Sequence, residues 1–348
     1  MRQRRVLVNT AILLHGTSGS ATATRALVDA LGHLPDSEVR EVSPRSRRRG
    51  AVRNAAADAR WDLWQASRAL PDVDLLVSPC NIGLRGRARQ HLLVVHDVMA
   101  LEHPDLYDRR FAAYFRLLVP RSVRSADRVL TLSEHAADAV RRMDPGADVR
   151  VVAWAHPGGA STRACFPARP VVLMVGATEP VKNQAVGVEA VARLRRSSGV
   201  DVGLRVVGPA GRAESAVRSA LAAVDPTGAW TSREVDVPAA VLDTAYASSW
   251  LLLQPSHDEG FGLPLVEAAR HGLPTVHSGR GAMPSVLAQV DAGGVSAEAL
   301  AAAMAPLLEA SRWATVADAA VERARAFDPE VFRETVRTEV VDLLPGPA

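Results

Sequence analysis

Residues 250–272 read WLLLQPSHDEGFGLPLVEAARHG, a run in which a strand, a glycine-rich loop and a helix follow one another. The segment 250–254 predicts a buried strand because it is short and rich in leucine. Pro264 and Gly272 stand where helices commonly begin and end. A loop that leads from a strand into a helix N-terminus presents backbone N–H groups and a positive helix end to an anion. This stretch therefore predicts an anion site, and a diphosphate suits it.

The alternation of strand and helix continues on both sides of this stretch. Short apolar runs alternate with helix-periodic segments, which is the pattern of a parallel sheet with crossover helices. In the second half of the chain the predicted strands are 171–175, 203–207, 250–254 and 275–277, and the predicted helices are 184–196, 213–224 and 264–271. In the first half the predicted strands are 6–9, 39–42, 75–78, 92–96, 128–132 and 149–153. Ligands of such sheets bind beyond the carboxyl ends of the strands.

The sequence predicts two domains of this kind. Its 348 residues exceed the size at which a single hydrophobic core stops growing. The stretch HPGGAST at 156–162 interrupts the periodicity with proline and glycine, as a linker does. We therefore expect one doubly wound, Rossmann-like α/β domain in residues 1–156 and a second in residues 157–328. Residues 329–348 start with a helix-periodic segment, which we expect to pack back across the domains.

Composition indicates a soluble, cytoplasmic protein. The two cysteines, Cys80 and Cys165, stand far apart and lack the spacing of a zinc site or a disulfide framework. The N-terminus has the outline of a secretory signal, but Asn9 and Thr10 interrupt its apolar run, so we expect a buried first strand there. No segment approaches the roughly 20 apolar residues that span a bilayer.

Charge is distributed unevenly along the chain. Residues 1–166 contain 25 Arg against 17 Asp and Glu, a balance of +8, whereas the remainder has a balance of −5, since the whole chain carries +3. A basic first half suits an anionic membrane surface or an anionic acceptor, and a solvated arginine-rich surface explains it equally well. The segment 105–128, with its arginines and aromatics, is the candidate membrane contact, although we favour burial of its aromatics. Nucleic acid is not an expected partner, because no aromatic platform accompanies the arginines.

Two carboxylates frame the glycine-rich loop. Glu259 lies in the loop and Glu267 lies in the helix after it, eight residues later. Carboxylates accept paired hydrogen bonds from vicinal hydroxyls, which is how dinucleotide-binding folds hold ribose. Solvent-exposed glutamates, or a favourable charge near the helix start, would explain the same residues without a ligand.

The segment from Glu259 to Glu267, with its Gly-Phe-Gly-Leu-Pro core, resembles the donor signature of family 4 of the retaining GT-B glycosyltransferases. The resemblance covers about residues 92–277 well and residues 1–91 only in outline. It implies two facing Rossmann-like domains (GT-B), the first on the acceptor side and the second binding the donor. It further implies that Glu259 lies at the transferred hexose and that Glu267 holds the nucleotide ribose. The loop amides that would meet the phosphates or the hexose belong to Gly260, Phe261, Gly262 and Leu263.

Residues 175–183, VGATEPVKN, resemble the segment of this family that places basic side chains on the donor diphosphate. Gly176 ends the predicted strand and Lys182 matches the family's lysine. The chain has 40 arginines and a single lysine, Lys182, so a compact ammonium group stands at this one position. Ala177 and Val181 replace residues that are frequently basic in the family. Neutralisation of the diphosphate is therefore expected to depend on Lys182 and on the loop amides.

The first half supplies further candidates at predicted strand ends. His96 and Asp97 follow the strand 92–96, and the resemblance implies that His96 faces the hexose, with Asp97 orienting it or binding acceptor. A hydrogen-bonded structural histidine is the alternative. Ser133 is a predicted helix N-cap whose family counterpart lies near the cleft. Gly16 and Gly19, in the loop after the first strand, could bring amides to phosphate or acceptor, and the absence of a GxGxxG pattern there disfavours a dehydrogenase.

We therefore predict a retaining hexosyltransferase, with a mannose-type sugar as the guess. The acceptor would be a hydroxyl of a glycan, a lipid-linked glycan or a small-molecule glycoside. The expected catalytic residues are His96, Lys182 and Glu259. No cofactor and no metal ion are expected, because protein groups would meet the charge of the departing diphosphate. The alternatives are a non-catalytic nucleotide-sugar-binding partner of an active transferase, an epimerase acting on a sugar nucleotide and, last, an oxidoreductase. The expected location is the cytoplasm, with peripheral contact at the inner membrane face as an option.

Overall fold

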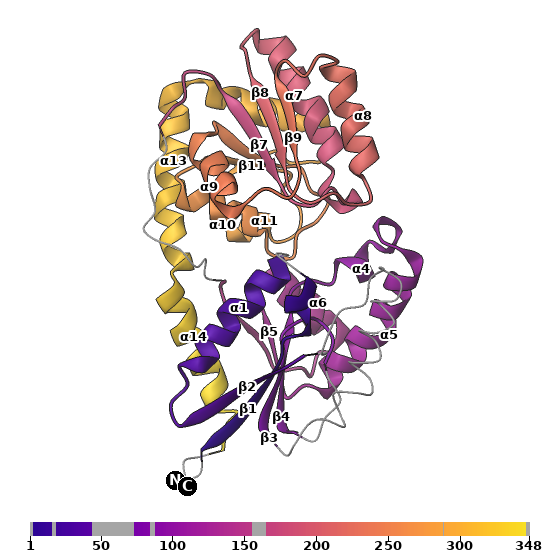
Figure 1. Ribbon diagram of the computed structural model, residues 1–348, viewed down its shortest axis with the longest axis vertical. Helices are drawn as coiled ribbons and strands as arrows, with labels where there is room; N and C mark the ends of the chain where they lie inside the picture. The colour runs from indigo at the N-terminus through magenta and orange to yellow at the C-terminus, as the bar shows by residue number, and fades with distance from the viewer. Residues whose placement is uncertain are drawn as a thin grey trace. The chain divides into compact units, whose positions relative to one another are not determined.

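The computed structural model describes residues 3–15, 19–43, 73–83, 88–154, 165–287 and 289–345. The chain divides into two compact units (Figure 1). Unit 1 comprises Met1–Pro157 and Asp328–Ala348, and unit 2 comprises Gly158–Phe327. The predicted linker at 156–162 lies outside the described residues.

Unit 1 contains a six-stranded sheet in the order β2-β1-β3-β4-β5-β6. All of its neighbouring strands are parallel. Its strands are β1 (Arg4–Asn9), β2 (Ser37–Val42), β3 (Val73–Ser78), β4 (Ala88–Val95), β5 (Arg128–Thr131) and β6 (Val149–Val151). Val6 and Val8 are buried in β1, which confirms that the chain starts with a core strand.

Helices pack on both faces of this sheet. Successive side chains of a strand point to opposite sides, so each face presents apolar side chains that a helix can cover. Leu93 and Val95 of β4 pack with Phe115 and Val119 of α5. The helical elements of unit 1 are η1 (Ala11–His15), α1 (Gly19–Gly32), α4 (Met99–Glu102), η3 (Pro104–Leu106), α5 (Arg109–Ser125), α6 (Glu134–Met143) and α14 (Pro329–Val341). The last of these packs against α1, so the chain returns to unit 1 after completing unit 2.

The buried side chain of Arg128 binds the C-terminal end of α14. The Arg128 guanidinium donates to the two carboxylate oxygens of Asp342 at 2.7 and 3.1 Å and to Asp148 at 2.8 Å. It also donates to the backbone oxygen of Glu339 at 2.6 Å. The hydrogen bonds from Arg128 to Asp342, together with the guanidinium charge, hold the pKa of the Asp342 carboxyl below its ordinary value. Charge-assisted bonds of this kind are roughly twice as strong as neutral ones.

Unit 2 contains a second six-stranded sheet in the order β12-β11-β10-β7-β8-β9, again parallel throughout. Its strands are β7 (Val171–Val175), β8 (Gly203–Val207), β9 (Thr231–Glu234), β10 (Leu251–Gln254), β11 (Thr275–His277) and β12 (Val290–Asp291). The predicted bounds of β7, β8 and β11 are correct to the residue. The strand order reverses beside β7, the first strand of unit 2 along the chain, and ligands bind at such switch points.

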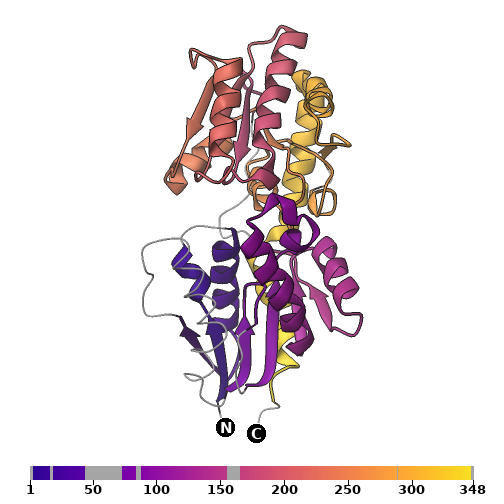
Figure 2. The ribbon, with the colours of Figure 1, turned by 90° about the vertical axis from the view of Figure 1, so that its right-hand side faces the viewer.

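Different helices pack on the two faces of this sheet (Figures 1 and 2). Val172 and Met174 pack with α7, α8 and α12, whereas Leu173 and Val175 pack with α9 and α10. The helical elements of unit 2 are η4 (Pro180–Lys182), α7 (Gln184–Ser198), α8 (Glu214–Val224), α9 (Ala239–Ser248), α10 (Leu263–Arg270), α11 (Met283–Val286), α12 (Ala297–Met304), η5 (Ala305–Leu308), α13 (Ala310–Ala324) and η6 (Arg325–Phe327). The fold class is therefore the predicted one, with a doubly wound α/β sheet in each unit.

Candidate functional site

The loops that follow β7 and β10 form the core of the candidate site. The two strands are parallel neighbours, so both loops leave the sheet at the same edge. The backbone N–H of His257 donates to the carbonyl of Val181 at 2.8 Å. The Asn183 amide donates to the carbonyl of Pro255 at 3.1 Å. These bonds hold the two loops against each other.

Lys182 and Glu259 meet where these loops touch. The Lys182 Nζ lies 2.7 Å from each carboxylate oxygen of Glu259. The side chains are 22% and 5% exposed, so the pair is shielded from water on the carboxylate side. The Oε1 atom of Glu259 also accepts from Gln254 Nε2 at 2.5 Å and from Ser256 Oγ at 2.7 Å. Four hydrogen bonds therefore fix the Glu259 carboxylate next to the only lysine of the chain.

Sequence reasoning missed Gln254 and Ser256, although both lie in the stretch that predicted the site. Both are buried polar residues at the end of a strand, where apolar residues would be expected. A buried polar side chain needs a partner, and the carboxylate three to five residues later provides it. Polar residues at the end of an apolar strand, followed closely by a glutamate, were thus the sequence pattern that could have identified Gln254 and Ser256.

The glycine-rich loop ends in the N-terminus of α10. Gly262 precedes the helix with φ +88°, a left-handed conformation, and a Cβ atom there would lie 2.4 Å from Leu265 Cδ1. Only glycine fits this position without strain. Among the described residues, the N–H groups of Phe261, Gly262 and Leu263 have no hydrogen-bond acceptor. Together with the positive end of α10, these donors form a suitable site for an anion.

Gly176 directly follows β7, and Gly208 directly follows the neighbouring strand β8. The N–H of Gly176 donates to the carbonyl of Val207 at 3.0 Å. Gly208 has φ +139°, and a Cβ atom on it would lie 2.4 Å from the carbonyl oxygen of Gly176. The close approach of these two backbones brings the β8–α8 loop against the loop that carries Lys182.

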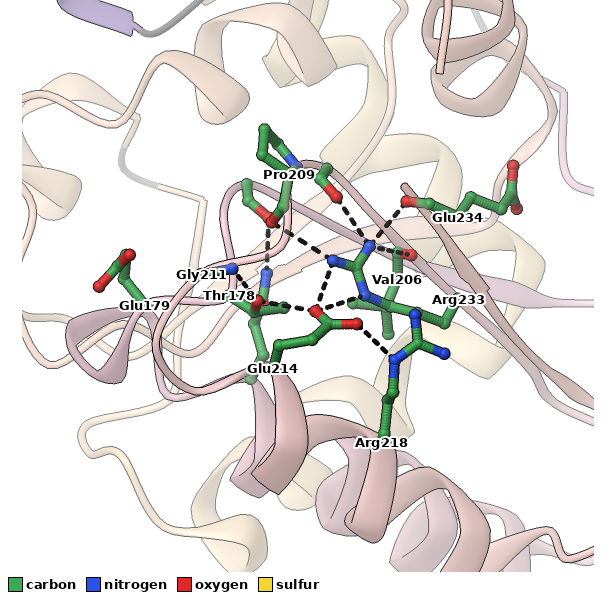
Figure 3. A network of polar contacts seen from close by, with 12 residues as sticks. Thr178, Glu179, Val206, Pro209, Gly211, Glu214, Arg218, Arg233 and Glu234 are labelled. Carbon is green, nitrogen blue, oxygen red and sulfur yellow. Dashed lines mark hydrogen bonds and ion pairs between the residues drawn. The ribbon is translucent and has the colours of Figure 1, made fainter. Parts of the chain in front are cut away.

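A buried polar network holds these two loops together (Figure 3). Arg233, on β9, donates to Glu214 Oε2 at 2.8 Å and to the carbonyl of Gly208 at 2.8 Å. Thr178 Oγ1 donates to the same Glu214 oxygen at 2.8 Å and accepts from the N–H of Gly211 at 2.7 Å. The Arg233 hydrogen bond keeps the pKa of Glu214 below its ordinary value. Apart from Thr178, the residues of the network lie outside the quoted motifs, and sequence reasoning did not identify the network.

The second carboxylate of the motif has a different partner. Glu267, one turn into α10, accepts a hydrogen bond from the Tyr246 hydroxyl at 2.5 Å. Burial raises the pKa of Glu267, and the Tyr246 hydrogen bond opposes that rise only in part. The structure therefore joins Glu259 to Lys182 and places Glu267 against α9. The predicted roles of these residues toward a donor remain predictions.

In unit 1, His96 is buried and neutral. Its Nε2 lies 2.7 Å from the carbonyl oxygen of Pro79, which can only accept, so Nε2 carries the hydrogen and Nδ1 carries the lone pair. Burial lowers the pKa of His96 to about 4, against a smaller opposing effect of the Pro79 bond. The imidazole lines a cavity of about 20 Å³ together with Trp154 and Phe332. A neutral histidine of this tautomer can accept a hydroxyl hydrogen at Nδ1.

The remaining candidates of unit 1 lie at helix starts. Asp97 Oδ1 accepts from the N–H of Met99 at 3.1 Å, ahead of α4. Ser133 is the N-cap of α6, and its Oγ accepts from the N–H of Ala136 at 3.2 Å, which confirms the predicted cap. Gly19 is the first residue of α1, whereas Gly16 lies outside the described residues.

Comparison with known proteins identifies the fold. Residues 169–310 match the family model described as glycosyl transferases group 1. WaaG, a glycosyltransferase involved in lipopolysaccharide biosynthesis, superposes with a TM-score of 0.70 at 16% identity, over 99% of this chain and 100% of WaaG. HepE of Anabaena, in complex with UDP-glucose, gives a TM-score of 0.70 at 15% identity, over 97% of this chain and 99% of HepE. The sucrose-phosphate synthase of Thermosynechococcus elongatus gives 0.68 at 16% identity, over 98% and 99%. A search of curated protein sequences returned no match.

Proposed function

We propose that this chain, whose residues 169–310 match the family model of glycosyl transferases group 1 and whose fold is that of GT-B glycosyltransferases, transfers a hexose from a nucleoside diphosphate sugar to a hydroxyl acceptor, with retention of configuration and without a metal ion. The observation that supports this proposal is the Lys182–Glu259 pair beside the amides of Phe261, Gly262 and Leu263, for which the described part of the chain provides no acceptor. One cation and a row of backbone donors suit a diphosphate, and a carboxylate next to them suits a sugar.

In this proposal the diphosphate replaces Glu259 as the partner of Lys182. The bond between the anomeric carbon and the diphosphate oxygen breaks, a new bond forms to the acceptor oxygen, and the proton of the acceptor hydroxyl passes to the departing diphosphate. Negative charge grows on the departing diphosphate, where the ammonium and the N–H groups of Phe261, Gly262 and Leu263 are already in place. Preorganised donors of this kind stabilise a transition state because they need no reorganisation as the charge develops. Ala177 supplies no cation. Lys182 therefore neutralises a larger share of the diphosphate charge than it would beside an arginine.

The proposed sugar contacts are Glu259 and, from unit 1, His96. Glu259 is held in place by its hydrogen bonds to Gln254 and Ser256 and can accept from hexose hydroxyls once Lys182 has turned to the phosphate. Nδ1 of His96 provides a neutral acceptor. Hydrogen bonds from hydroxyls to such fixed acceptors select a sugar by the positions of its hydroxyl groups.

Uridine nucleotides are the first donors to test, because the HepE structures contain UDP and UDP-glucose. A panel of UDP-glucose, ADP-glucose and GDP-mannose includes the mannose-type sugar and tests the nucleotide and the hexose together. We expect one member to stabilise the protein against unfolding. A donor present at 100 times its Kd adds about 2.7 kcal/mol. Release of the nucleoside diphosphate, slowly into water or faster with an acceptor glycoside, is the expected activity, and it should survive EDTA.

Other outcomes of this panel identify the alternatives. Binding without release of nucleoside diphosphate, under any acceptor tried, would indicate a nucleotide-sugar-binding partner of another transferase. Conversion of the donor into an epimer without acceptor would indicate a sugar-nucleotide epimerase. Either result contradicts the transferase proposal. Loss of activity on EDTA treatment contradicts its metal-free part alone.

A second proposal concerns the surface of α5, which we propose as a contact with an anionic membrane. The helix contains five exposed arginines and no acidic residue. Among the described residues, no carboxylate pairs with any of the five, which are Arg109, Arg110, Arg116, Arg121 and Arg124. Phe111 and Leu117 on the same helix are 43% and 52% exposed, whereas Phe115 is buried, so the expected burial of the aromatics holds only in part. In the described part of the chain, no helix combines the length and the apolar character needed to cross a bilayer.

Vesicles of phosphatidylglycerol mixed with phosphatidylcholine should bind the protein, and added salt should release it. The double variant Arg116→Gln/Arg124→Gln should bind at least tenfold more weakly, because each basic group near such a surface contributes about 1 kcal/mol. The matched control is Arg196→Gln/Arg312→Gln, which removes two exposed arginines of unit 2. Equal weakening in both variants would show that total charge, rather than α5, is responsible.

A further inference from the structure

Tyr246 of α9 donates its hydroxyl hydrogen to Glu267 Oε2 over 2.5 Å. The phenol is buried, and it is the only tyrosine of unit 2, since the other two are Tyr107 and Tyr114. Burial and the adjacent carboxylate raise the pKa of Tyr246 well above its ordinary value. The Tyr246 hydroxyl therefore keeps its hydrogen and donates it to Glu267.

The ring of Tyr246 is itself held in place. It stacks on the imidazole of His271 with 5.7 Å between centroids and 6° between planes. His271 Nε2 lies 3.0 Å from Asp243 Oδ1. Asp243 is on α9, and His271 directly follows α10. The contact thus fastens the two helices to each other at the level of Glu267.

A carboxylate on a helix turns freely about its side-chain bonds unless a partner fixes it. A bond to Oε2 selects one orientation, and the carboxylate still has lone pairs for further donors, because its two oxygens together accept about four hydrogen bonds. Fixing a recognition group before the ligand arrives lowers the entropy cost of binding.

We propose that Tyr246 is a positioning residue for ribose recognition: its hydroxyl holds the Glu267 carboxylate in the orientation that accepts hydrogen bonds from the ribose hydroxyls of the donor. This inference rests on the proposed function, in which Glu267 binds the ribose. It adds a residue from α9, outside the strand-loop-helix motif that predicted the site. Tyr246 acts through Glu267 and contacts no reacting atom.

The test compares the affinities of UDP and 2′-deoxy-UDP, measured by calorimetry, for the full chain and its variants. The parent should prefer UDP by about tenfold or more, as expected for a hydroxyl bonded to a carboxylate. Tyr246→Phe removes only the hydroxyl and keeps the ring on His271. It should reduce the preference to threefold or less while the affinity for 2′-deoxy-UDP changes less than twofold. Tyr114→Phe, the same change in unit 1, should retain the full preference. If the donor panel selects guanosine, GDP and 2′-deoxy-GDP serve as the pair.

A merely structural role predicts a different result. If Tyr246 only supports packing, Tyr246→Phe weakens both nucleotides equally and leaves their ratio intact, which overturns the inference. Glu267→Gln provides a second route: it should lose the preference by itself, and Tyr246→Phe should then change the ratio no further. A parent that binds both nucleotides equally refutes the ribose role of Glu267 and the inference with it. A parent that binds no nucleoside diphosphate refutes the proposed function instead.

Discussion

Lys182→Ala is expected to abolish the donor-dependent stabilisation and to lower kcat/KM by about three orders of magnitude. The loss of a charge-assisted bond to phosphate costs about 1.5 to 3 kcal/mol in binding. The cost rises in the transition state, where charge collects on the departing diphosphate. Because Ala177 offers no second cation, no neighbouring side chain in this loop compensates. Thermal unfolding with and without donor measures the first effect, and steady-state kinetics measure the second.

Two controls accompany this prediction. Lys182→Arg keeps the charge and should retain part of the donor stabilisation, although a planar guanidinium fits the lysine position poorly. Reductive methylation of the parent should modify Lys182 and the N-terminal amine alone, because the chain has no other lysine. Bound donor should protect Lys182 from this reaction. A Lys182→Ala protein that folds and is still stabilised fully by donor would contradict the assigned role.

Glu259→Gln is expected to lower kcat by 10² to 10³ while binding of UDP remains within threefold of the parent or tightens. The substitution keeps the shape and removes the charge that would stabilise the sugar in the transition state. In the parent, Glu259 also competes with phosphate for Lys182, with both carboxylate oxygens at 2.7 Å. Removing the charge therefore frees the ammonium for the diphosphate. Single-turnover kinetics and calorimetry separate the two effects.

The control for this variant is Glu179→Gln. Glu179 lies in the loop that also carries Lys182, where its carboxylate pairs with Arg212 at 2.8 Å and is more exposed than Glu259. Its replacement should leave kcat within about twofold of the parent, since a partly exposed ion pair contributes little. An unchanged kcat in Glu259→Gln would exclude Glu259 from the chemistry.

The sequence predicted the fold of unit 2 well because its strands and helices differ clearly in periodicity. The runs at β7, β8 and β11 are apolar and bounded by turn residues, so their bounds were correct. The helix α10 begins at Leu263, which makes Pro264 its second residue instead of the predicted first. The edge strand β9 has the sequence TSRE and was missed, because an edge strand with polar side chains carries no apolar signal.

The contacts of the site were less accessible to sequence reasoning than its residues. Lys182 and Glu259 are 77 positions apart, and only the resemblance to a family suggested that both serve one ligand. Tyr246 stands 21 positions before Glu267 on another helix, a spacing that predicts no contact. Such pairs arise from the order of strands in the sheet, and the order β10-β7-β8 cannot be read from local periodicity.

The return of the chain to unit 1 has a consequence for biosynthesis. The sheet of unit 1 is complete by β6, but the helix that packs on α1 is made only after all of unit 2. While residues 158–327 are being synthesised, the nascent chain therefore lacks the helix that covers the α14-facing side of α1. Asp342 cannot neutralise the charge of Arg128 until the end of α14 has been synthesised. Truncation before residue 342 should accordingly yield chains that depend on chaperones.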